Sequence, residues 1–210
     1  MTIQAPTFDP VYLSRDSVFG CHPDRMLADL VEQRRLTGRA LDLGAGEGRN
    51  SFYLARRGFT VDAQDVSPRA VRELQVMARR HALPVSAAAG DIRDLGVRRG
   101  PTHLRGPYDL VVADTVLCHL PLPEARATAL QIISLMNPGA WLYASAFATD
   151  DPRESEFAPL VQTYFEVADF CDLFTELAHE RCGKTSLVDH RHGPPHRHSL
   201  LQLVAQKLMA

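Results

Sequence analysis

The sequence predicts an α/β fold, a doubly wound sandwich whose parallel sheet has about seven strands and ends in an antiparallel hairpin. Short β-rich runs alternate with helical segments of ten or more residues, which is typical of parallel crossovers with helices on both faces. After Phe147 the alternation stops, and two β-rich runs flank the turn at 193–195. With 210 residues, 45% of them apolar, the chain is long enough for one large core.

Each element follows from a local pattern. Leu27, Leu30 and Val31 recur at helical spacing, and the first β-rich run, 40–43, stops at Gly44. The expected helices cover 23–35, a segment that includes 52–55, 68–80, 123–135 and about 160–178. The expected strands cover 40–43, 60–63, 84–88, 108–113 and 141–147, followed by the hairpin runs 183–190 and 199–206.

One domain is expected, because no repeat and no Pro/Gly/Ser linker separates two apolar halves. Residues 1–24 are interpreted as an N-terminal arm or lid and residues 25–210 as the domain itself. Phe8, Tyr12 and Phe19 could form a lid that excludes water, or the arm could simply pack on the core. The sequence leaves monomer and homodimer equally open.

Composition and charge exclude several classes of partner. A formal charge of −2 provides no whole-molecule field for nucleic acid or an anionic membrane surface. No apolar run approaches the roughly 20 residues that span a bilayer, and the N-terminus lacks a leader pattern, so a cytoplasmic protein is expected. The cysteines at 21, 118, 171 and 182 form no Cys-x-x-Cys pair, which predicts reduced thiols and excludes a zinc ribbon.

A glycine-rich loop follows the first expected strand, at the position where an α/β sheet binds nucleotide-like ligands. Gly44, Gly46 and Gly48 let the backbone turn sharply and approach a ligand without a Cβ in the way. Asp65 ends the next strand, 21 residues after Gly44, where its carboxylate can accept hydrogen bonds from ribose hydroxyls. The segment therefore predicts an adenosine-binding site.

The spacing of the loop distinguishes between adenosine cofactors. A dinucleotide fingerprint needs its third glycine one residue later than Gly48, where this chain has Arg49. Asp42, at the end of the first strand, would repel a pyrophosphate but suits the ammonium group of a methionine moiety. A nicotinamide oxidoreductase is therefore only the third choice.

This pattern of an acid, three alternating glycines and a later acid resembles the class I S-adenosylmethionine-dependent methyltransferases. The resemblance extends over roughly 25–150 and includes 90–92, 108–112 and the turn-like 137–140. It implies a Rossmann-like methyltransferase sheet and S-adenosyl-L-methionine as cofactor, with the family's adenine contacts at Asp91 and Ile92. The cofactor-binding residues it implies are Asp42, Gly44, Ala45, Gly46, Arg49, Asn50, Asp65, Val66, Asp91, Ile92 and Asp114.

A narrower resemblance is to the tellurite-resistance methyltransferases, carried by the loop at 42–51, by His22 and by the His190-Arg191 pair. Ala45, the long loop at 96–107 and the segment 117–121 depart from that family. The last segment is more similar to small-molecule methyltransferases of the ubiquinone-biosynthesis type. The expected acceptor is a small molecule or small oxyanion, with tellurite or a related chalcogen favoured. The alternatives are a biosynthetic O-, N- or S-methyltransferase and a non-catalytic cofactor- or metal-binding sensor.

The histidine-rich segment 189–198 has three interpretations. In extended backbone each His-x-His pair points both rings to one face, and the intervening turn could bring the pairs together. It could be a solvated turn, or a substrate-facing cluster that includes His190, Arg191 and Arg197. It could also be a zinc or nickel site, with the candidate ligands His190, His192, His196 and His198.

Methyl transfer from a sulfonium is an in-line displacement that needs no covalent enzyme intermediate. A pocket can add a base for a protic acceptor or cations that hold an oxyanion. His190, Arg191 and Arg197 suit the second task, and His119 or His22 the first. His119 could equally be a packed histidine, and Cys118 is expected to be a small buried hydrophobe.

Overall fold

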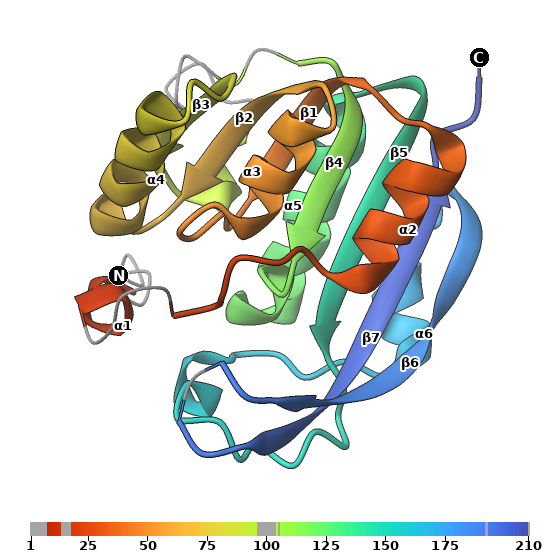
Figure 1. Cartoon of the computed structure of the whole chain (residues 1–210). Helices are drawn as coiled ribbons and strands as arrows, with labels where there is room; N and C mark the ends of the chain where they lie inside the picture. Colours follow the sequence, from red (N-terminus) through yellow and green to blue (C-terminus); the bar gives the residue numbers. More distant parts are fainter. Residues whose placement is uncertain (1–7, 14–17, 96–103, 105, 192, 210) are drawn as a thin grey trace. The chain divides into compact units, whose positions relative to one another are not determined.

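The computed structural model describes residues 8–13, 18–95, 104, 106–191 and 193–209 (Figure 1). It divides into two compact units, Met1–Arg105 and Gly106–Ala210, which are described in turn. Most of the loop at 96–107 and His192, a candidate metal ligand, lie outside the described residues. Across the described ranges, no helix is long and apolar enough to cross a bilayer.

The first unit is a parallel α/β arrangement with strand order β3-β2-β1. Its strands are β1 (Gly38–Leu43), β2 (Phe59–Asp65) and β3 (Val85–Ala89). Its helices are α1 (Asp9–Leu13), α2 (Arg25–Arg34), α3 (Arg49–Arg56), α4 (Pro68–Arg80) and the 3₁₀ turn η1 (Ile92–Asp94). Every predicted element of this unit is present, and wherever both ends of an element were predicted they shift by at most two residues.

Local chemistry sets the start of α4. The Ser67 side chain accepts a hydrogen bond from the Ala70 backbone N–H, and Pro68 occupies the first turn. Leu74 and Ala78 then face inward, and Leu74 packs with Ala63 of β2 in a buried cluster. Because cap, proline and apolar period agree, the predicted helix 68–80 is confirmed at both ends.

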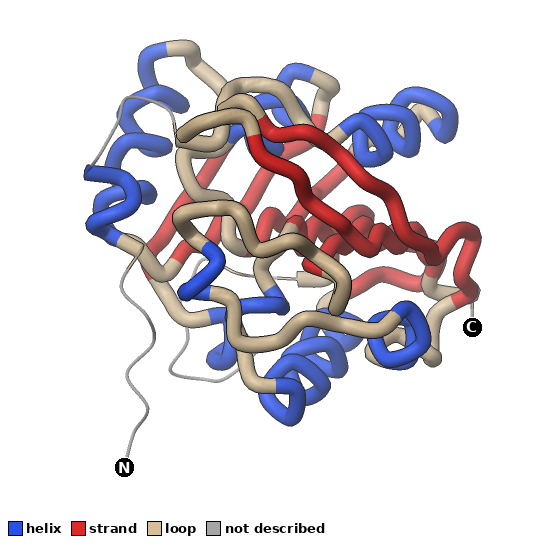
Figure 2. The backbone as a smooth tube through the Cα atoms, turned by 90° about the horizontal axis from the view of Figure 1, so that it is seen from below, coloured by secondary structure: helices blue, strands red, loops and turns tan. Residues whose placement is uncertain are grey.

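The second unit contains β4 (Tyr108–Asp114), β5 (Met136–Phe147), β6 (Ala178–Asp189) and β7 (His196–Gln206), in the order β4-β5-β7-β6 (Figure 1). Figure 2 distinguishes the strands, in red, from the helices, in blue. Strands β4 and β5 are parallel, whereas β7 is antiparallel to both β5 and β6. The helices are α5 (Leu122–Ser134), α6 (Val167–Asp172) and the 3₁₀ turns η2 (Leu117–His119) and η3 (Ala158–Leu160). The predicted C-terminal antiparallel hairpin is confirmed.

The predicted helix at about 160–178 is wrong for most of its length, because only Val167–Asp172 is α-helical. Phe165 instead forms an extended bridge with Ala148, and its N–H donates to the Phe147 carbonyl oxygen at 2.9 Å. From Ala178 onward the backbone pairs with β7, so the hairpin begins five residues earlier than expected. Tertiary pairing of the backbone therefore overrides the helical spacing of the apolar residues.

The turn-like segment 137–140 is part of β5, which begins at Met136 rather than at Trp141. Tyr108 pairs with Met136 and Leu110 with Trp141, so the intervening residues leave the ladder with β4. The Asn137 side chain bonds Asp109 at 2.8 Å, and Gly139 takes a φ of +81°. The predicted turn is thus an excursion within a strand.

The expectation that all thiols are reduced is wrong for one pair, because Cys171 and Cys182 form a disulfide. Helix α6 and strand β6 bring their Cα atoms to 6.4 Å, within the range that a disulfide spans. Sequence spacing did not reveal this closure, because the strand was expected to begin only at residue 183. Cys21 is exposed and Cys118 is buried, and both are free thiols.

We expect one thiol per native chain to react with Ellman's reagent, and that thiol is Cys21. Burial raises the pKa of Cys118 to about 12, so neither access nor thiolate is available there. Denaturant without reductant should raise the count to two, and prior reduction should raise it to four. Four reactive thiols in denaturant alone would contradict the Cys171–Cys182 disulfide.

Candidate functional site

The glycine loop between β1 and α3 adopts a conformation that side chains oppose. Gly46 has a φ of +53°, and a Cβ built there would lie 2.9 Å from the Tyr12 hydroxyl oxygen. Gly48 has a φ of +92°, and its Cβ would lie 2.9 Å from Leu74 Cγ. The absence of a side chain at Gly48 therefore allows Leu74 to pack closely against the loop. Its absence at Gly46 allows the Tyr12 hydroxyl to approach the loop.

Asp65 at the end of β2 holds the glycine loop in place through hydrogen bonds to its carboxylate. Its Oδ2 accepts a hydrogen bond from the Gly46 N–H at 2.8 Å, and its Oδ1 accepts one from the Ser67 N–H at 2.8 Å. The side chain is buried, and this burial raises the pKa of Asp65 although both N–H groups act in the opposite direction. The predicted ribose-binding acid is thus also the anchor of the loop.

Asp42 at the end of β1 is 1% exposed and accepts a hydrogen bond from the Ser51 hydroxyl at 2.5 Å. Ser51 and the buried Asn50 belong to the first turn of α3, which Arg49 begins. The loop, the helix start and the acid therefore form one connected group at the carboxyl edge of β1. This edge is where α/β sheets bind ligands.

Asp91 and Ile92 follow β3, as the resemblance implied. Asp91 caps η1 and holds the Arg93 guanidinium, with Oδ2 and Nη2 2.5 Å apart. Burial raises the pKa of Asp91, but the hydrogen bonds from Arg93 outweigh this effect and leave the pKa below its ordinary value. Ile92 is buried and Val66 is half-buried, so both can supply apolar contacts.

Helix α1 belongs to the arm predicted at residues 1–24 and lies against the start of α4. The Ser67 hydroxyl donates to Asp9 Oδ1, and Arg69 Nε donates to the Tyr12 carbonyl oxygen at 3.0 Å. Burial raises the pKa of Tyr12 well above its ordinary value, and the charges of Asp65 and Glu47 add to the effect. The Tyr12 hydroxyl therefore stays protonated beside Gly46 and can act as a donor.

Asp114 is the one predicted cofactor residue in the second unit. It ends β4, and its Oδ1 accepts a hydrogen bond from the Ser145 hydroxyl at 2.6 Å. Thr115 follows with a left-handed φ of +51°, a conformation that costs energy for a β-branched residue. The Thr115 N–H donates to Ser145 Oγ at 2.9 Å, which helps hold this turn.

His119, the predicted base, is a half-buried residue of η2. Its Nδ1 lies 2.9 Å from the Leu160 carbonyl oxygen, which can only accept, so Nδ1 carries the hydrogen. Burial lowers the pKa of His119, and the Leu160 carbonyl only partly opposes this effect. His119 is thus neutral at physiological pH, with its proton directed to the protein backbone.

The predicted cations of the hairpin are placed differently from one another. His190 is exposed, directly after β6. Arg191 holds Asp189, with Nη2 and Oδ2 2.5 Å apart, and its backbone N–H donates to Asp189 Oδ1 at 2.7 Å. Arg197 is exposed, and its backbone N–H donates to Glu154 Oε2 at 2.9 Å.

Of the predicted metal ligands, the structure brings His196 and His198 together and adds Asp189 to them. His190 does not belong to this group among the described residues. Asp151 also contacts the group, because its Oδ2 lies 3.1 Å from His198 Nδ1. No sequence pattern indicates Asp151, which is 47 residues from His198.

A family model described as a methyltransferase domain matches residues 20–186. The chain belongs to this methyltransferase domain family. The resemblance that the glycine loop indicated is therefore confirmed at the level of the family.

Two curated relatives align with a little more than half of this chain. The probable S-adenosyl-L-methionine-dependent methyltransferase TehB of Haemophilus influenzae is 27% identical over 126 residues, 59% of this chain and 42% of its own. The ubiquinone biosynthesis O-methyltransferase of Xanthomonas axonopodis pv. citri is 36% identical over 107 residues, 51% of this chain and 42% of its own. The matches thus span less than half of the length of these relatives.

Solved structures extend the likeness to the whole fold. The crystal structure of TehB from Haemophilus influenzae matches 95% of this chain and 65% of its own, with a TM-score of 0.74 and 18% identity. Magnesium protoporphyrin IX methyltransferase from Synechocystis, with bound S-adenosylmethionine, matches 88% and 77%, with a TM-score of 0.64 and 27% identity. The predicted Rossmann-like fold is confirmed.

Proposed function

We propose that this chain is an S-adenosylmethionine-dependent methyltransferase that acts on a small molecule or a small oxyanion. The observation that carries the proposal is the loop at Gly44–Gly48 with Asp65 bonded to the Gly46 N–H. Family membership supports it, as does the magnesium protoporphyrin IX methyltransferase, whose structure contains S-adenosylmethionine.

The residues of the first unit fit this cofactor. Gly46 presents backbone without a side chain next to the Tyr12 hydroxyl, and the buried Asp65 supplies acceptors for ribose hydroxyls. Asp42 offers a negative charge for the methionine ammonium group, and Asp91 with Ile92 would contact the adenine. When bound, S-adenosylmethionine supplies an electrophilic methyl group on a positively charged sulfur. The chain's own residues bind and orient the cofactor and the acceptor, and they exclude water from the site.

The position of α1 beside the glycine loop favours the exclusion of water from the cofactor site. Tyr12 is 4% exposed and adjoins Gly46, and Asp9 with Arg69 holds α1 in that position. We assign α1 as a cover for the methionine end of the cofactor site. A buried hydroxyl with a raised pKa donates a hydrogen bond without adding a negative charge.

The second unit supplies the acceptor-side candidates. Neutral His119 can orient a protic acceptor. The side-chain nitrogens of His190 and Arg197 are exposed and can bind an oxyanion. Arg191 is already held by Asp189, so its role is to order the hairpin around them. Tellurite or a related chalcogen oxyanion is the favoured acceptor, because the loop at 42–51, His22 and the His190-Arg191 pair resemble the tellurite-resistance methyltransferases.

A biosynthetic O-methyltransferase is the second candidate. The ubiquinone biosynthesis O-methyltransferase is the more identical of the two relatives, at 36%, and its alignment covers 51% of this chain. A phenolic acceptor would need a base rather than cations, so activity would depend on His119 and not on Arg197.

A panel of acceptors tests these alternatives. Purified protein with S-adenosylmethionine should form S-adenosylhomocysteine with tellurite or selenite in excess of the rate without acceptor, as measured by mass spectrometry. Turnover with catechols or hydroxyquinolines instead would support the O-methyltransferase. Cofactor binding without turnover on any acceptor would favour a sensor and contradict the proposed enzyme.

A further inference from the structure

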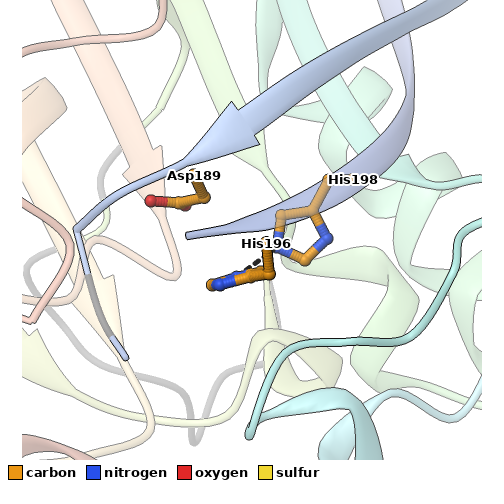
Figure 3. Close-up of side chains that lie close together, drawn as sticks. All are labelled: Asp189, His196 and His198. Carbon is orange, nitrogen blue, oxygen red and sulfur yellow. Dashed lines mark hydrogen bonds between the residues drawn. The ribbon is translucent and has the colours of Figure 1, made fainter. Parts of the chain in front are cut away.

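Two buried histidines at the start of β7 share one face of the hairpin with Asp189. His196 and His198 alternate along the strand, and Asp189 pairs directly with His196 across the hairpin. Their exposed fractions are 7%, 6% and 3%. One ligand atom from each of the three residues lies within 4.8 Å of the others (Figure 3).

The hydrogen bonds of the two rings fix where their protons are. His196 Nδ1 lies 2.9 Å from the Pro194 carbonyl oxygen, which can only accept. His198 Nδ1 lies 3.1 Å from Asp151 Oδ2, and that carboxylate already accepts the N–H groups of Ser199 and Arg153. Both Nδ1 atoms therefore donate, and in the neutral rings both Nε2 atoms carry lone pairs.

These two Nε2 atoms are only 3.1 Å apart. Two lone pairs at this distance repel unless a positive centre is shared between them, either a proton or a metal ion. The dashed contact in Figure 3 is thus a hydrogen bond only if one ring is an imidazolium. A metal ion satisfies both nitrogens without placing an extra proton in a buried pair.

We propose that His196 and His198, through Nε2, and Asp189, through a carboxylate oxygen, bind a divalent transition-metal ion of the zinc class. Zinc bonds of about 2.0–2.2 Å place neighbouring tetrahedral ligand atoms about 3.4 Å apart, close to the observed nitrogen separation. Asp189 completes the set by exchanging one of its contacts with Arg191 for the metal ion. Two imidazoles and a carboxylate suit zinc, nickel or cobalt and disfavour magnesium or calcium.

The hydrogen-bond partners of His196 and His198 are of the kind that metal-binding histidines have. Ligating histidines donate their second N–H to a carboxylate or backbone carbonyl, as His198 does to Asp151 and His196 to Pro194. The Arg191 guanidinium holds Asp189, and its Nε lies 3.0 Å from both carboxylate oxygens. With the Arg191 backbone N–H and Nη2 contacts, each carboxylate oxygen already accepts two hydrogen bonds, so metal binding by Asp189 replaces one of its contacts with Arg191. Three protein ligands leave at least one position for water or an anion.

The test uses full-length protein without a polyhistidine tag, first treated with a chelator and then dialysed. Zinc is titrated in competition with a chromogenic chelator, and cobalt is added separately so that its visible absorption reports the ligand field. We expect one zinc per chain and a cobalt spectrum of a four- or five-coordinate site. Absence of stoichiometric zinc or cobalt binding would overturn the proposal and leave a proton-sharing pair.

Variants locate the site within the hairpin. His196→Gln and His198→Gln should weaken zinc binding by more than the roughly 100-fold that loss of an outer partner costs. Asp151→Asn, which changes only such an outer partner, should weaken it by about 10- to 100-fold. His190→Gln, an exposed histidine of the same hairpin, is the matched control and should bind like wild type.

An equal loss of zinc affinity in His190→Gln would overturn the proposed ligand set. Wild-type zinc affinity in His196→Gln and His198→Gln would also overturn it. Near-ultraviolet circular dichroism of each metal-free variant checks its fold. If the His196 or His198 variant unfolds, Asp151→Asn and the wild-type cobalt spectrum still decide, because unchanged affinity in Asp151→Asn contradicts the arrangement.

Discussion

Gly46→Val is expected to abolish binding of S-adenosylhomocysteine, with an affinity loss of more than about 100-fold. The residue has a φ of +53°, which a β-branched side chain opposes, and its Cβ would lie 2.9 Å from the Tyr12 hydroxyl oxygen. The loop must therefore shift, and the Gly46 N–H would leave Asp65. Titration calorimetry measures the affinity.

Gly183→Val is the matched control for this substitution. Gly183 lies in β6, and a Cβ there would meet no atom within 4 Å. Valine suits an extended strand, so this variant should bind S-adenosylhomocysteine like wild type. Normal binding by Gly46→Val would mean that the loop does not contact the cofactor.

Asp65→Ala should weaken S-adenosylhomocysteine binding by about 2–3 kcal/mol, or roughly 30- to 150-fold, because two hydrogen bonds to a charged acceptor are lost. The N–H groups of Gly46 and Ser67 also lose their acceptor, which adds about 1–3 kcal/mol of destabilisation for each buried group. Calorimetry and urea unfolding measure the two effects separately.

Asp62→Ala is the control on the same strand. Asp62 pairs with Arg39 at 2.8 Å, and loss of this partly exposed ion pair should change cofactor affinity by about twofold at most. Equal affinity losses in the two variants would show that disruption of β2, rather than loss of the ribose acceptor, is responsible.

The first unit could be predicted well because its signals are local. Ser67 and Pro68 begin α4, and Gly44, Gly46 and Gly48 mark the loop at the end of β1. Each signal lies within a few residues of the structure it specifies, and the apolar periodicity agrees with it. The role of Asp65 as anchor of Gly46 was not foreseen, since it depends on a contact across 19 residues.

The second unit was less predictable because its structure depends on distant pairing. Phe170, Phe174 and Leu177 follow helical spacing and are buried, yet the chain leaves the helix after Asp172. The pairing of Ala178 with Gln206 forms only when β7 is in place. No local pattern reports such a partner.

The histidine-rich segment illustrates the same limit at the level of a site. Alternation along the strand predicted that His196 and His198 share a face, and this is what β7 shows. The sequence could not select Asp189 over His190, because the choice depends on where β6 ends. Nor could it supply Asp151, which reaches His198 from the segment after β5.

Titration calorimetry of the wild-type chain with S-adenosylhomocysteine, run beside reduced nicotinamide adenine dinucleotide, tests the central claim most directly. The cofactor site described for the first unit predicts one S-adenosylhomocysteine per chain with micromolar or tighter affinity and no binding of the dinucleotide. Absence of heat with S-adenosylhomocysteine, or saturable binding of the dinucleotide alone, would contradict the assignment of Gly46 and Asp65 to an S-adenosylmethionine site.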